Sequence, residues 1–406
     1  MAKIKPFKSY LPGKPPEMVA TKNVAQFSKS ELEHEIANNP NSFLQIVLPD
    51  YLESEKSEPN SIERFKKVRL KFDEFKNKKV YIINEQAAYY IYEQQCDGEK
   101  YIGIMACCSI DDYKMKVIKP HEQIISAKSE LLCNYLQQTH INAEPVAMFY
   151  EDDSDINQLI KNTIKEKAKI SFTYKDGSKH RLWTINNKLL IEKITSFFDQ
   201  EHYLYIADGH HRTAASDKYG ELMRKNNPAK ASLKSDFFMS ILFAESQIKL
   251  TSFNRVVKNC SKYSFQEIEK LINKNFHIEL LKKASAPTRK QEMMMYTNNA
   301  WYKLHYKCAN NEIGSDSELL TNLVLNPIFG IEHFSNNRSI NFIPGSEGEK
   351  RLEELVDNGS YDYAFSLFPI ETTTIKEFAN QNKNMPAKST WVLPKLLSGL
   401  LIYETL

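Results

Sequence analysis

The segment LYIADGHHRTAASDKYG, residues 204–220, constrains the fold more than any other part of this sequence. An apolar run over Tyr203–Ala207 predicts a buried strand, and a helical pattern follows Arg212. Asp208 is a good helix N-cap, and Gly209 lets the backbone approach a ligand closely. The first turn of a helix carries unpaired N–H groups and a partial positive charge. A strand, a glycine turn and a helix start therefore predict a site for an anion, most naturally phosphate.

The side chains at this helix start add acid–base and phosphate-binding chemistry. Histidine side chains ordinarily change charge near neutral pH, so His210 and His211 could work as catalytic acid or base. Arg212 could bind phosphate oxygens with two parallel hydrogen bonds, and Asp208 could sit near a magnesium ion. The simpler interpretation is a helix start with surface histidines. Two adjacent histidines and an arginine directly after an apolar strand favour the anion site.

Composition excludes several functional classes. A net charge of +3, with Lys and Glu interspersed, gives no clustered basic face for nucleic acid. No apolar run approaches the roughly 20 residues needed to span a bilayer, and the first residues lack the apolar core of a signal peptide. The six scattered cysteines form no C-x-x-C pair, which favours reduced thiols in a cytoplasm.

The order of strand and helix signals predicts an α+β protein rather than a doubly wound parallel sheet. Asp97-Gly98 and Asp176-Gly177 each separate two apolar runs, as in β-hairpins. The run SFLQIVLP over 42–49 is interpreted as a strand. A chain of 406 residues should hold two or three domains. We expect an N-terminal segment over 1–80, a core with the DGHHR site over 81–247, and an α/β region over 248–406 that packs on the core.

Two further runs could carry chemistry. The first is Lys119-Pro120-His121-Glu122, in which the carboxylate of Glu122 could act as general base for a hydroxyl. Lys119 and His121 of the same run are candidate substrate contacts. The alternative is an ordinary surface loop. The run MPAKST over 385–390, followed by Pro394-Lys395, contains Lys-Ser-Thr but lacks the glycines of a P-loop. Lys388 and Lys395 either meet an anion or only decorate a loop.

These three runs, in this order, resemble a bacterial domain-of-unknown-function family, the one numbered ten-fifteen. The matching stretches are IADGHHR, IKPHEQIISAK and MPAKSTWVLPK, and the resemblance covers nearly the whole chain. The family usually carries a Pro-Tyr-Asp stretch soon after its N-terminal strand. This chain has ATKNVAQFSKSE over 20–31 instead, so it lacks any ligand contact made through that tyrosine and aspartate.

The DGHHR run also resembles the ParB/sulfiredoxin-like superfamily, whose free serine kinases carry a similar motif and use a glutamate as base. The resemblance implies a ParB/sulfiredoxin-like mixed core that binds ATP or ADP with Mg²⁺. It implies that Gly209, His210, His211 and Arg212 hold phosphate, with Asp208 and Lys388 beside them. It also implies Glu122 as the base on a serine hydroxyl, with His210 and His211 as further catalytic candidates.

Three functions follow as alternatives. The first is a phosphotransferase that acts on serine or phosphoserine with a nucleotide. The second is a phosphatase for phosphoserine or another small metabolite, in which a histidine protonates the leaving oxygen or takes the phosphoryl group. The third is a ParB-like nucleotide-binding regulator without catalysis, and the near-neutral charge counts against its binding DNA.

Overall fold

The protein folds as two compact units, each with its own β-sheet. The structure is a computed structural model and describes residues 1–200, 203–308, 315–332, 337–385 and 388–406. Unit 1 comprises Met1–Pro120, Ile124–Ile248 and Pro394–Leu406, and unit 2 comprises His121–Gln123 and Lys249–Leu393. These two units do not coincide with the three expected segments. Residues 1–80 belong to the same unit as the DGHHR segment, and residues 394–406 return to that unit.

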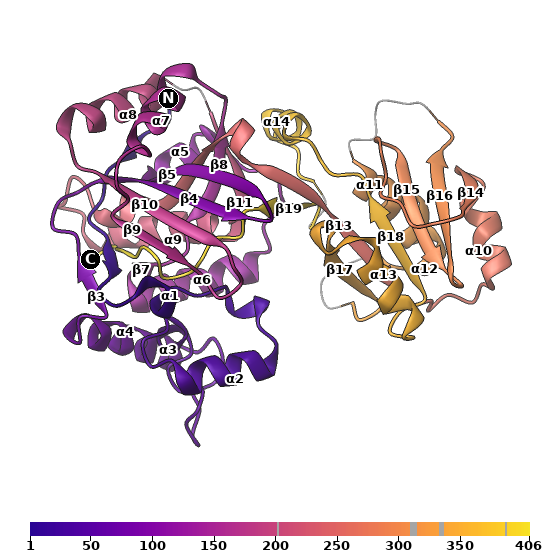
Figure 1. The fold of residues 1–406 in the computed structure, drawn as a ribbon, viewed down its shortest axis with the longest axis horizontal. Helices are drawn as coiled ribbons and strands as arrows, with labels where there is room; N and C mark the ends of the chain where they lie inside the picture. Colours follow the sequence, from indigo (N-terminus) through magenta and orange to yellow (C-terminus); the bar gives the residue numbers. More distant parts are fainter. Residues whose placement is uncertain (201–202, 309–314, 333–336, 386–387) are drawn as a thin grey trace. The chain divides into compact units, whose positions relative to one another are not determined.

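Unit 1 is built on a large mixed sheet with the strand order β6-β11-β8-β12-β5-β4-β10-β9, and β1 pairs with β5 (Figure 1). β11 runs parallel to β6 and antiparallel to β8, while β8 and β12 are parallel. The strands are β1 (Ile4–Lys5), β4 (Tyr89–Cys96), β5 (Glu99–Ser109), β6 (Ile118–Lys119), β8 (Val146–Tyr150), β9 (Ile170–Thr173), β10 (Lys179–Ile185), β11 (Leu204–Asp208) and β12 (Phe237–Ala244). The prediction of an α+β protein rather than a doubly wound parallel sheet is confirmed, and the pairing in this sheet is mixed.

Local signals explain the hairpins of this sheet. Asp97 and Gly98 join β4 to β5, and both have positive φ angles, 51° and 79°. Such a pair is what a two-residue hairpin turn with the sheet's own twist requires. Gly177, with φ of 85°, lies in the β9–β10 connection. Both predicted hairpins are confirmed.

The helices of unit 1 pack on this sheet and on one another. Ile194 and Phe198 of α8 and Ile156 of α7 join the apolar core of the sheet. Cys133 and Leu136 of α6 pack with Ala215 and Tyr219 of α9 in a separate cluster. The longer helices are α2 (Lys29–Asn38), α4 (Ile62–Asn77), α6 (Ser126–Thr139), α7 (Ser154–Thr163), α8 (Lys188–Gln200) and α9 (His210–Asn226). The short elements are β2 (Tyr10–Pro12), α1 (Pro16–Val19), η1 (Val24–Gln26), α3 (Leu44–Val47), β3 (Tyr81–Ile83), α5 (Ile110–Lys114), β7 (Ile141–Asn142), η2 (Lys234–Asp236), η3 (Glu245–Gln247) and β20 (Tyr403–Glu404).

The run at 42–49 is a helix rather than the predicted strand. Leu44 and Ile46 are fully buried, in two different apolar clusters. A short apolar run does not separate strand from helix by its pattern alone. The packing of α3 against neighbouring helices decides the outcome here.

Unit 2 has its own sheet in the order β14-β16-β15-β18-β13-β17, and β19 pairs with β13. Its strand pairings are antiparallel, which differs from the expected α/β region. The physical reason is visible at Asn298 and Asn299, both left-handed (φ 49° and 57°), which turn β15 directly into β16. The strands are β13 (Lys249–Val257), β14 (Phe276–Leu281), β15 (Glu292–Thr297), β16 (Ala300–Tyr306), β17 (Ile340–Pro344), β18 (Tyr363–Leu367) and β19 (Thr390–Leu393).

Helices of unit 2 bury apolar residues on this sheet. Ile268 and Ile272 of α10 pack with Met293 and Phe365, and Leu352 of α13 packs with Met294. The helices are α10 (Phe265–Ile272), α11 (Asp316–Leu320), η4 (Thr321–Leu325), α12 (Asn326–Phe329), η5 (Gly345–Glu347), α13 (Gly348–Asp357) and α14 (Thr372–Asn380). In the described part of the chain, no helix combines the length and the apolar character needed to cross a membrane.

Candidate functional site

The DGHHR segment forms the predicted strand–glycine–helix junction in unit 1. β11 ends at Asp208, and α9 begins at His210. Gly209 has φ of 106° and occupies the N-cap position, and no side chain caps the helix there. Asp208 is therefore not the N-cap that the sequence predicted, because the left-handed glycine already makes the turn. The helix start is left as a cluster of backbone N–H groups beside charged side chains.

Two cations flank the Asp208 carboxylate. Nη2 of Arg212 and Nζ of Lys395 each lie 3.6 Å from Oδ2 of Asp208. The side chains are partly exposed, 48% for Asp208 and 27% for each cation. Two positive groups thus lie near one negative group at the N-terminus of a 17-residue helix, where the helix dipole favours negative charge. Lys395 belongs to the third sequence motif, so the fold brings that motif to the first.

Arg212 is held by the backbone as well as by Asp208. Its Nη1 donates a 2.5 Å hydrogen bond to the carbonyl of Pro145, which precedes β8. A Cβ added to Gly209 would lie 3.2 Å from Cζ and Nη2 of the Arg212 guanidinium. Glycine is therefore required at position 209 both for its φ angle and for the close approach of this side chain.

The two histidines differ in their environment. His210 is buried, with 3% of its surface exposed, whereas His211 is half-buried. Nε2 of His211 accepts a 3.1 Å hydrogen bond from the backbone N–H of Ile125, in the IKPHEQIISAK motif. A backbone N–H can only donate, so this nitrogen carries no proton and the neutral ring has its proton on Nδ1.

Lys119 lies next to the junction on β6, which pairs in parallel with β11. Its ammonium group lies 3.9 Å from the ring centroid of Tyr203, and the residue is 7% exposed. Burial lowers the pKa of Lys119. The cation–π contact offsets part of the cost of burying this charge.

The remaining candidates lie in unit 2, where the second and third motifs meet. The backbone N–H of Met385 donates to the carbonyl of His121 at 2.7 Å. The backbone N–H of Lys388 donates a 3.5 Å hydrogen bond to Oε1 of Glu122. Lys388 is exposed and has φ of 61°, while His121 is 1% exposed. Pro386 and Ala387 of the MPAKST motif lie outside the described residues.

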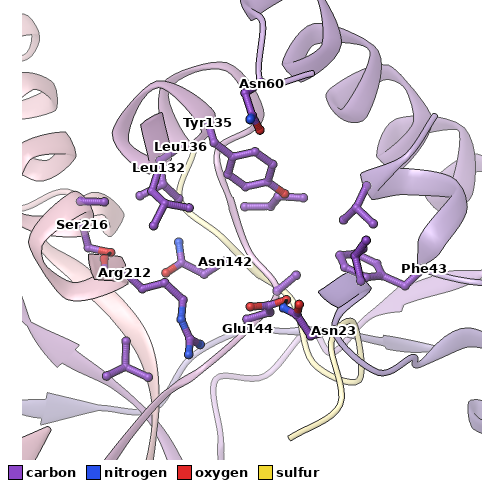
Figure 2. A pocket seen from close by; sticks show the side chains of 16 residues that line it. Asn23, Phe43, Asn60, Leu132, Tyr135, Leu136, Asn142, Glu144, Arg212 and Ser216 are labelled. Atoms are coloured by element: carbon purple, nitrogen blue, oxygen red, sulfur yellow. Dashed lines mark hydrogen bonds between the residues drawn. The ribbon is translucent and has the colours of Figure 1, made fainter. Parts of the chain in front are cut away.

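A pocket of about 390 Å³ opens beside Arg212 in unit 1 (Figure 2). Arg212 and Ser216 of α9 and Leu132, Tyr135 and Leu136 of α6 form one side of it. Glu144 also lines it, and its Oε1 accepts hydrogen bonds from Nδ2 of Asn23 (2.8 Å) and Oγ of Ser398 (2.7 Å). Sequence reasoning did not single out Glu144. The sequence signal available for Glu144 was its position in NAEPVAMFY, just before β8, the strand that pairs with β11.

The segment that departs from the expected Pro-Tyr-Asp stretch lines this same pocket. Asn23 and Val24 lie within ATKNVAQFSKSE, and both contact the pocket. The side chain of Asn23 caps η1 by accepting a hydrogen bond from the backbone N–H of Ala25, and its amide donates to Glu144. The substitution of this stretch therefore changes the wall of a pocket that also contains Arg212.

Asp208 fits a nucleotide-bound magnesium ion better than a resident metal site. Among the described residues, no three His, Cys, Asp or Glu side chains gather as a metal-binding group. Mg²⁺ in nucleotide sites takes one or two carboxylates, and phosphate oxygens and water supply the other ligands. The partly exposed carboxylate of Asp208 is suited to that single role.

Comparison with known sequences assigns the family. A family described as "Protein of unknown function (DUF1015)" matches residues 4–323, most of the chain. The chain belongs to the DUF1015 family. The DUF1015 match includes the DGHHR junction, the Lys119–Glu122 run and Glu144, and it ends before Lys388 and Lys395. No curated protein matches this DUF1015 chain.

Solved structures similar to this DUF1015 protein are distant. A free serine kinase in complex with AMP has 13% identity and a TM-score of 0.37, over 72% of this chain and 88% of that chain. SbnI with a C-terminal truncation, from Staphylococcus aureus, has 10% identity and a TM-score of 0.38, over 72% and 85%. A conserved hypothetical protein from Pyrococcus furiosus has 11% identity and a TM-score of 0.35, over 72% and 90%. Similarity at this level carries no information about the activity of the DUF1015 chain.

Proposed function

We propose that this DUF1015 protein is a phosphotransferase that acts on serine or phosphoserine and holds phosphate at the start of α9. The observation that supports this most is the arrangement of Asp208, Arg212 and Lys395 around a left-handed Gly209. Phosphoryl transfer depends mainly on positioning and on neutralising charge, which helix N–H groups and two cations supply. ATP or ADP with Mg²⁺ would supply the phosphoryl group and further neutralise its charge.

Each residue has a defined role in this proposal. The backbone N–H groups at Gly209 and His210 and the guanidinium of Arg212 bind phosphate oxygens, with Lys395 beside them. His211 is proposed as a further phosphate contact, and Asp208 as a ligand of the magnesium ion that accompanies the nucleotide. In unit 2, Lys388 is proposed as a further phosphate contact and Glu122 as the base that removes the serine hydroxyl proton. Such a base contributes roughly 10²–10⁴-fold to the rate. Lys119 and His121 are proposed substrate contacts.

Phosphorus NMR on the purified protein with Mg²⁺ tests the reaction. One tube holds serine with ATP or ADP, and the other holds O-phosphoserine alone. We expect phosphoserine to form in the first tube and no phosphate to be released in the second. Phosphate release without nucleotide would instead establish the phosphatase. Nucleotide binding without any turnover would leave the ParB-like regulator as the function.

Replacement of one residue tests the site itself. R212A should reduce turnover at least 100-fold, because the guanidinium contacts the phosphate in the proposed complex. Arg351 on α13 is a matched control, since among the described residues it pairs with Glu347 and Glu354 on the surface of unit 2. R351A should keep wild-type turnover. Equal turnover in R212A and R351A would refute the site.

A further inference from the structure

The pocket beside Arg212 has apolar walls that face each other. Leu132 and Leu136 of α6 lie on one side, and Phe43 lies on the other (Figure 2). Val24 also lines the pocket. Its volume of about 390 Å³ lies within the range of pockets that bury small-molecule ligands, roughly 300–1,000 Å³. The pocket is therefore suited to a flat apolar group held between two walls, and it is larger than a phosphate ion requires.

Polar groups that the fold leaves unpaired line the same pocket. The side-chain amides of Asn60 and Asn142 form no hydrogen bond with any other residue that the structure describes. An amide offers both donors and an acceptor, which is the pattern needed to bind the edge of a nitrogen heterocycle. Amides from two separate segments thus supply hydrogen-bonding capacity that the protein itself does not use.

Glu144 is fixed in place and keeps one oxygen available. Asn23 and Ser398 both donate to Oε1, so the carboxylate is oriented without being neutralised by a cation among the described residues. Arg212 lines the same pocket but is engaged by Asp208 and the Pro145 carbonyl rather than by Glu144. The pocket is therefore lined by an acceptor, Glu144, and by a cation that can bind an anion, Arg212. A carboxylate repels phosphate but accepts hydrogen bonds from the hydroxyls of a ribose.

We propose that this pocket binds the nucleoside part of a nucleotide whose phosphates lie at the start of α9. The base lies between the walls at Leu136 and Phe43, with its edge toward Asn60 and Asn142. The ribose hydroxyls donate to Oε2 of Glu144, and Arg212 contacts the phosphate. This inference takes one element from the proposed function, namely that the anion bound at the start of α9 is the phosphate of a nucleotide. It assigns a binding role to Glu144, Asn60, Asn142 and Val24.

Equilibrium binding to the full chain tests this inference without requiring turnover. Isothermal titration with Mg²⁺ measures the affinity for ADP, GDP, CDP, UDP and inorganic pyrophosphate. We expect at least one nucleoside diphosphate to bind tenfold or more tightly than pyrophosphate, because only the nucleotide fills the pocket. V24W, which fills the pocket from a partly exposed position, should weaken that nucleotide to the affinity of pyrophosphate. Pyrophosphate binding itself should be unchanged in V24W.

A second variant keeps the test valid if V24W fails to fold. E144Q preserves the size of the side chain but removes the charge, and we expect about fivefold weaker nucleotide binding with unchanged pyrophosphate binding. The matched control is E63Q, since Glu63 lies on the exposed surface of α4 with a side chain that is 72% exposed. Thermal unfolding of each variant verifies that the fold is retained.

The outcomes separate this inference from the proposed function. If E144Q and V24W bind the nucleotide as tightly as wild type, the nucleoside does not lie in this pocket and the inference is refuted. Loss of both nucleotide and pyrophosphate binding in R212A would then still support the anion site. If wild type binds neither pyrophosphate nor any nucleotide, the anion site fails, and the proposed function fails with it.

Discussion

Substitution of Gly209 by alanine should damage anion binding more than it damages the fold. Gly209 has φ of 106°, which an L side chain rarely adopts. An added Cβ would also lie 3.2 Å from Cζ and Nη2 and 3.3 Å from Nε of Arg212, so the guanidinium has to move by a few tenths of an ångström. That displacement acts on the side chain that links Asp208 to the Pro145 carbonyl.

The two effects have different magnitudes. Alanine in a left-handed backbone conformation lowers the free energy of unfolding by about 1–2 kcal/mol. Alanine also reduces the conformational entropy of the unfolded chain, which raises the free energy of unfolding by roughly 0.4–1 kcal/mol. We therefore expect a net loss of about 1 kcal/mol in the free energy of unfolding. A hydrogen bond to a charged group contributes about 1.5–3 kcal/mol, so misplacing Arg212 should weaken pyrophosphate binding about tenfold or more.

Gly177 provides the matched control, because its φ of 85° is also left-handed but nothing lies within 4 Å of an added Cβ. G177A and G209A should lose similar unfolding free energy in urea titrations. Only G209A should lose pyrophosphate affinity, measured by titration calorimetry. If the two variants bind pyrophosphate equally, then the placement of Arg212 by Gly209 does not define the anion site.

Two further predictions concern unit 1. His180 lies on β10 and is fully buried, and burial lowers its pKa from 6.5 to about 4, an effect that the charge of Asp176 partly opposes. The unfolded chain takes up this proton first, so the stability is fully present above pH 6.5 and about 3 kcal/mol is lost as the pH falls to about 4. Urea midpoints at pH 7.5 and 5.0 measure this slope, and a slope unchanged in H180Q would contradict it. Asp50 is 1% exposed and bonds Arg64 and Lys67 at 2.9 Å each, so D50N should cost about 3 kcal/mol by removing the buried anion that both cations share. Thermal unfolding of D50N beside the exposed control E63Q measures that loss, and equal melting temperatures would contradict it.

Short-range patterns in the sequence were enough to predict the strand–glycine–helix junction and both hairpins. The bonds that form these structures join residues only a few positions apart, and left-handed glycines at 98, 177 and 209 mark the turns. The capping of α2 is local in the same way, since Ser28 and Glu31 satisfy each other's backbone N–H. Asp208 shows the limit of such signals, because the neighbouring Gly209 takes the N-cap and frees the carboxylate for Arg212 and Lys395.

Only the tertiary structure decided which distant segments meet. The pocket wall at Glu144 depends on hydrogen bonds from Asn23 and Ser398, which are 121 and 254 positions away. β20 returns to pair with β7, and this brings Lys395 into the same unit as Asp208. The physical reason is that hydrophobic packing is non-directional. The sequence therefore holds no periodic pattern that shows which distant segments pack against each other. Residues 204–220 alone therefore predicted the strand–glycine–helix junction, whereas the pocket beside it required the fold.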